Sequence, residues 1–122
     1  MADEATVRLS LAFEKGRMSD SVALAATTYD VSGNNYTRNI QDVGFAAPEA
    51  IALGDLTVGG WCYFRNLEAD GGNFVNLYAA TGETAFIKLK AGEAAIFPMI
   101  AAAPFAQADT AAVRLLFFGI DL

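Results

Sequence analysis

The sequence contains no histidine, a single cysteine and few charged residues. Charged side chains make up 18% of its 122 residues, against an average of about 25% for soluble domains. Without histidine, the chain cannot form a Ser-His-Asp triad, a His-ligated metal site or an imidazole acid–base site. We therefore expect a non-enzymatic protein with no catalytic residue, no metal site and no cofactor.

The single cysteine, Cys62, can form neither an intrachain disulfide nor a cysteine-ligated structural zinc site. It lies in the apolar segment Trp61-Cys62-Tyr63-Phe64. A reactive thiol is one interpretation, but a nucleophilic cysteine would lack its usual histidine partner. Free cysteines are commonly small buried apolar residues, and we expect Cys62 to be one.

Basic residues are few and dispersed. Eight Lys and Arg against fourteen Asp and Glu give a net charge of −6, and the basic residues form no cluster along the sequence. Proteins that bind nucleic acid or anionic lipid surfaces present such clusters. We therefore expect neither a nucleic-acid partner nor a membrane partner.

Long hydrophobic runs are also missing. The longest apolar stretch, residues 94–106, is interrupted by Pro98 and Pro104, whereas a membrane-spanning helix needs about 20 apolar residues. The first four residues, Met-Ala-Asp-Glu, are acidic, whereas a signal peptide begins with positive charge. We expect a soluble protein made in the cytoplasm.

Apolar residues, by contrast, make up 54% of the chain. A chain of this length can bury about two-thirds of its unfolded surface, which supports one core. We therefore interpret residues 1–122 as a single domain. Alternation begins early: Val7, Leu9, Leu11 and Phe13 share one face of a predicted strand with one buried side, and Gly16 ends it.

Further strand patterns recur along the chain, separated by turn signals. The alternation and the turns predict about eight short strands in an all-β antiparallel sandwich or barrel. Asp70-Gly71-Gly72-Asn73 is typical of a hairpin turn. Residues 46–53 are the best helical candidate, because Pro48 suits a first turn and Gly54 a C-terminal cap, although an irregular strand fits equally well. The other predicted strands are residues 21–29, 36–43, 61–67, 74–78, 85–89, 94–99 and 111–120.

Three segments carry a resemblance to a known family. Arg65-Asn66-Leu67 is followed by a turn and by Asn73-Phe74-Val75; Leu89-Lys90-Ala91-Gly92-Glu93 forms a second turn; Thr110 begins a final Thr-Ala-x-Val-x-Leu strand. This succession resembles the small virion proteins of tailed bacteriophages, over roughly residues 57–122. In size and pattern it is most similar to capsid decoration (cement) proteins built as a single jelly roll.

The resemblance implies a homotrimer on the outside of the phage head, with the shell of major capsid protein as its partner. It brings over no catalytic residue. The stretch 94–106 contains more large apolar residues than a monomer of this size can bury, so we predict that it lies at a subunit interface. The predicted interface residues are Ile96, Phe97, Pro98, Met99, Ile100, Pro104 and Phe105.

Two other function classes stay open. A tail-fibre or baseplate module that binds a receptor or carbohydrate would need an exposed aromatic patch, because aromatic rings stack on the apolar faces of sugars. The rings that could form one, unless they pack in the core or between subunits, are Tyr29, Tyr36, Trp61, Tyr63 and Tyr78. A cupin-type enzyme would share the jelly-roll form, but cupins typically hold their metal with histidines.

Overall fold

The computed structural model describes residues 4–33, 35–54, 56, 59–69, 71–99 and 104–121. Within these ranges the chain forms ten β-strands and no helix. Every strand pair is antiparallel. The predicted all-β antiparallel class is therefore confirmed, with more strands than the eight expected. The chain divides into two compact units, Met1–Ser32 and Gly33–Leu122, and the single-domain interpretation stays a prediction.

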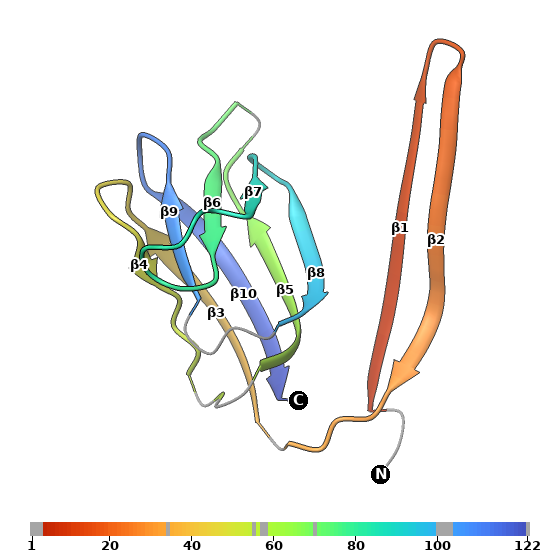
Figure 1. Ribbon diagram of the computed structural model, residues 1–122, viewed down its shortest axis with the longest axis horizontal. Coiled ribbons are helices and arrows are strands. Elements are labelled where there is room, and N and C mark those ends of the chain that lie inside the picture. The colour runs from red at the N-terminus through yellow and green to blue at the C-terminus, as the bar shows by residue number, and fades with distance from the viewer. Residues whose placement is uncertain are drawn as a thin grey trace. The chain divides into compact units, whose positions relative to one another are not determined.

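The first unit, the N-terminal hairpin, pairs β1 (Ala5–Lys15) with β2 (Met18–Tyr29). Figure 1 shows both as long strands joined at one end. Gly16 lies in the turn with a φ of +60°, a backbone conformation that glycine adopts without steric cost. The predicted strand that ends at Gly16 is thus confirmed.

The second unit, the two-sheet unit, contains the other eight strands in two four-stranded sheets. One sheet has the order β3-β10-β5-β8 and the other the order β4-β9-β6-β7, and Figure 1 shows them facing each other. The strands are β3 (Tyr36–Val43), β4 (Glu49–Ala50), β5 (Gly59–Asn66), β6 (Val75–Tyr78), β7 (Ile87–Leu89), β8 (Ala94–Pro98), β9 (Phe105–Ala108) and β10 (Val113–Asp121).

The pairing of these eight strands is nested. The first strand, β3, pairs with the last, β10; β4 pairs with β9, β5 with β8 and β6 with β7. The path is that of one long hairpin, which two further pairs, β10 with β5 and β9 with β6, wrap into two sheets.

One apolar core lies between the two sheets. Residues of β10 alternate strictly between buried and more exposed positions, as expected for a strand with one face on a core. The ring of Phe64 stacks on that of Phe97 at 5.5 Å and lies 5.0 Å from that of Phe117. Both sheets contribute to the core, which includes Val43, Cys62, Val75, Leu77, Leu89, Ala106, Ala108, Val113 and Leu115.

Two local predictions need correction. Of the two alternatives for residues 46–53, the helix does not form and the irregular strand does: the described chain bends at 45–47 and then forms the short strand β4, which pairs with β9. The backbone N–H of Ile51 donates to the carbonyl of Pro104 at 2.9 Å, so cross-strand bonds replace helical ones. The glycines at 71 and 72 do not close a hairpin either, because β5 and β6 lie in different sheets.

Candidate interaction surfaces

The structure separates the residues predicted to form a subunit interface. Met99 and Pro104 are buried, and Phe97 packs on the core through Phe64. Only Ile96 and Pro98 point away from the core on β8, while Phe105 on β9 is half-buried. Ile100 lies outside the described residues. Much of the apolar excess in this stretch is therefore absorbed inside the two-sheet unit, and its role between subunits stays a prediction.

Several of the same residues line an apolar cavity of about 520 Å³. Phe97, Pro98, Met99 and Pro104 contribute to its walls, and so does Phe86, which is 90% exposed. The other lining residues are Ile51, Phe64, Leu77, Tyr78, Ala79 and Ile87. The chemistry of these walls suits an apolar group.

The more extensive candidate surface is the outward side of the β3-β10-β5-β8 sheet. Strand register aligns Arg38, Phe118, Tyr63 and Ile96 in one row across all four strands. Their neighbours in the chain at positions 37, 117, 62 and 97 point to the core, so this row faces outward.

The adjoining rows of this side are also largely apolar. Tyr36 and Ile40 on β3 are 66% and 62% exposed, and the ring of Tyr36 lies 6.2 Å from that of Phe118. We call this surface the outer apolar face; it comprises Tyr36, Ile40, Trp61, Tyr63, Ile96, Pro98, Leu116, Phe118 and Ile120. Arg38, Arg65 and Arg114 are interspersed on it.

The aromatic residues considered for a sugar-binding patch are only partly brought together. Tyr36, Trp61 and Tyr63 share the outer apolar face. Tyr78 lies on β6 in the other sheet, where its hydroxyl donates to Gln107 at 3.2 Å. Tyr29 belongs to the N-terminal hairpin.

The three segments that carry the phage resemblance meet at one end of the two-sheet unit. Asn66 is fully buried. Its amide donates to the carbonyls of Asn73 and Leu89 at 2.9 and 3.0 Å, and its side-chain oxygen accepts from the backbone N–H of Glu68 at 2.9 Å. Its own backbone exchanges hydrogen bonds with the turn at Gly92 and Glu93.

Two further contacts tie in the last of these segments. The side-chain oxygen of Asn73 accepts from the hydroxyl of Thr110 at 2.6 Å. The carboxylate of Glu68 accepts from the backbone N–H of Arg114 at 3.2 Å and lies 3.4 Å from its guanidinium Nε. These three segments therefore form a hydrogen-bonded junction between the two sheets.

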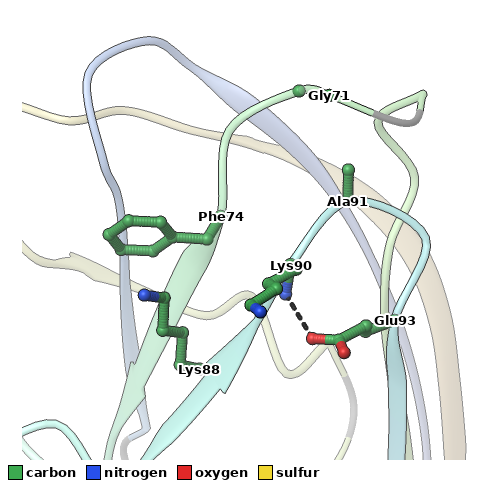
Figure 2. A pocket seen from close by; sticks show the side chains of 7 residues that line it. Gly71, Phe74, Lys88, Lys90, Ala91 and Glu93 are labelled. Carbon is green, nitrogen blue, oxygen red and sulfur yellow. Dashed lines mark hydrogen bonds between the residues drawn. The ribbon is translucent and has the colours of Figure 1, made fainter.

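A shallow pocket of about 520 Å³ opens beside this junction. Figure 2 shows the side chain of Lys88 reaching toward the ring of Phe74, with its Nζ 4.0 Å from the ring centroid. Glu93 accepts from the backbone N–H of Lys90 at 2.7 Å, which closes the neighbouring turn. The sequence did not predict this pocket, because Phe74 and Lys88 are distant in the chain and come together only when β6 pairs with β7.

Cys62 is buried, as expected. Its thiol donates to the carbonyl of Phe97 at 3.2 Å. Burial raises the pKa of the Cys62 thiol from 9.0 to about 12. Because the thiolate is the nucleophilic form, the Cys62 thiol is a poor nucleophile at neutral pH.

The N-terminal hairpin contains a surface that sequence reasoning placed in a core. Beyond Val7, the alternating face of β1 is open: Leu11 is 71% exposed and Phe13 is 53% exposed. The alternation correctly identified the face, but the expectation that it is buried is wrong. The residues of a strand determine which of its faces is apolar, but they do not determine whether another surface packs on that face.

Among the described residues, no group of three or more His, Cys, Asp or Glu side chains could hold a metal ion. In the same ranges no helix is long and apolar enough to cross a membrane. Comparison with models of known protein families, with curated proteins and with solved structures found no match.

Proposed function

We propose that this protein is a non-enzymatic structural protein of a tailed bacteriophage virion, and specifically a decoration protein that binds the outer head shell as a trimer. The observation that carries the proposal is the outer apolar face. It displays aromatic and aliphatic side chains across four strands. Apolar patches that exceed a few hundred Å² on a folded domain mark interaction sites.

The strand order supports a jelly roll as the fold of the two-sheet unit. A jelly roll is an eight-stranded, two-sheet arrangement. The nested pairs β3·β10, β4·β9, β5·β8 and β6·β7 are what a long hairpin yields when it is rolled into two sheets. The resemblance of residues 57–122 to jelly-roll decoration proteins agrees with this order.

The mechanism is adhesion between neighbouring shell subunits. A trimer presents three identical faces, so weak contacts made by each face act together once one of them has bound. A ligand that binds only the intact shell stabilises that shell by mass action. The net charge of −6 steers docking toward basic patches on the shell, which makes association slower at high salt.

The experiment measures binding to assembled shells, to free coat subunits and to whole particles. We expect saturable binding to shells only, and a higher temperature of DNA release from decorated particles. Ile40→Lys on the outer apolar face should weaken shell binding by about tenfold or more. Phe86→Lys is the matched control, because Phe86 is also an exposed large apolar residue but lies outside that face. Equal binding by the two variants contradicts the proposal.

A second function is a receptor- or carbohydrate-binding module of a tail fibre or baseplate. The exposed Tyr36 and the half-buried Trp61 and Tyr63 on the outer apolar face favour it, because aromatic rings stack on sugars. Labelled protein found only at the tail, together with equal DNA release with and without the protein, would favour this function over decoration.

A further inference from the structure

The N-terminal hairpin has two chemically different faces. Register places Leu11 opposite Val22 on one face, and Ala12 opposite Ser21 on the other. The first, which we call the hairpin apolar face, comprises Leu9, Leu11, Phe13, Met18, Val22 and Leu24. The second face carries small and polar residues, namely Ser10, Ala12, Glu14, Ser19, Ser21 and Ala23.

The hairpin apolar face is open along most of its length. Leu11, Met18 and Val22 are 71%, 59% and 68% exposed. A two-stranded hairpin alone is marginally stable in water, and within the described part of the chain β1 and β2 form a sheet of two strands only. A surface that covers this face is therefore needed whenever the hairpin is folded.

We propose that the hairpins of neighbouring copies of this chain pack together through their apolar faces. A second copy is always present in stoichiometric amount, as a permanent cover must be. The proposal locates the contact within the trimer suggested above; it rests on the self-association in that proposal but not on binding to a phage shell.

Area supports a second copy as the occupant. Five large side chains of this face are at least 37% exposed: Leu11, Phe13, Met18, Val22 and Leu24. At about 100 Å² of apolar area for each, one copy offers on the order of 500 Å². Two such faces together reach the roughly 1,000 Å² that a specific interface requires.

Charge supports the same occupant. Residues 5–29 contain three basic residues (Arg8, Lys15, Arg17) and two acidic ones (Glu14, Asp20), so their net charge is 3 − 2 = +1, whereas the whole chain carries −6. Two hairpins of charge +1 therefore repel one another far less than the remaining parts of two copies do, because the residues outside 5–29 carry −6 − 1 = −7. Lys15 and Asp20 lie on the apolar side near the turn, so each copy offers both signs to its neighbour.

The test compares two double variants of the full chain by light scattering over a range of concentrations. Leu11→Thr with Val22→Thr removes apolar surface but keeps residues that favour strands and pair well across them. Ala12→Thr with Ser21→Thr is the matched control at the neighbouring cross-strand pair of the opposite face. We expect the first variant to dissociate at about a hundredfold higher concentration than the unchanged protein, and the control to keep its oligomeric mass.

A second measurement covers the case in which the threonine variant loses the hairpin. The natural thiol is buried, so a single introduced cysteine is the only accessible one. Leu11→Cys should form disulfide-linked dimers under mild oxidation, and Ala12→Cys should form far fewer. Equal cross-linking of the two, or a monomeric unchanged protein, overturns the inference. If the hairpins cross-link but the protein does not bind shells, the inference about hairpin packing holds and the proposed decoration function is contradicted.

Discussion

The buried amide of Asn66 offers the sharpest test of the two-sheet unit. It makes three side-chain hydrogen bonds, to the carbonyls of Asn73 and Leu89 and from the N–H of Glu68, and it is fully buried. An intramolecular hydrogen bond contributes about 1 kcal/mol net, and a buried group left without a partner costs about 1–3 kcal/mol. Asn66→Ala should therefore lower the free energy of unfolding by about 3 kcal/mol or more.

The nearly isosteric change Asn66→Asp separates hydrogen bonding from packing. It keeps the acceptor for the N–H of Glu68, but an oxygen replaces the nitrogen that donates to Asn73 and Leu89. Oxygens would then face carbonyls in a buried site, where an unpaired charge is costly. We expect Asn66→Asp to destabilise at least as much as Asn66→Ala.

Urea denaturation at neutral pH, followed by tryptophan fluorescence, gives the free energies of unfolding. Asn76→Ala is the control: this asparagine is half-buried on β6, and its replacement should cost less than about 1 kcal/mol. If Asn66→Asp unfolds at the same urea concentration as the unchanged protein, the amide does not hold the junction and the reasoning fails.

Three further predictions concern the core. Phe64→Ala should lower the free energy of unfolding by about 3–5 kcal/mol, because Phe64 packs against two other rings; denaturation should show a clearly smaller loss for Phe64→Leu. Gly119→Ala should cost about 1–3 kcal/mol, since its Cβ would lie 2.6 Å from Phe117 and 2.8 Å from Leu56; an unchanged melting temperature would contradict this packing. Burial raises the pKa of Cys62 from 9.0 to about 12, so the unfolded thiol ionises first as the pH rises. Stability should therefore fall between pH 9 and 12, by up to about 1.4 kcal/mol per pH unit, and Cys62→Ala should show a shallower fall; identical slopes would refute this.

Local patterns sufficed for most of the strands, although no pattern predicted β9. Apolar alternation along β1 and β10 needs only the two-residue period of an extended backbone, and Gly16 supplies a turn by its own conformational freedom. The burial of Cys62 also followed from its apolar neighbours in β5. The absence of histidine excluded imidazole chemistry from the composition alone, without any structure.

Contacts between distant residues decided the rest. The helix signals of Pro48 and Gly54 act only within the segment, whereas Ile51 bonds to Pro104 far along the chain, and that pairing prevails. The turn at Gly71 is compatible with a hairpin or with a connection between two sheets. The connection forms because β5 pairs with β10 and β8 in one sheet, whereas β6 pairs with β9 and β7 in the other. The alternation of Leu9, Leu11 and Phe13 determines that one face of β1 is apolar, but burial requires a second surface, which the strand's own residues do not encode. The sequence therefore determined which side chains share a face, and only the tertiary structure decided that Phe97 and Met99 lie against the core while Leu11 and Phe13 stay open.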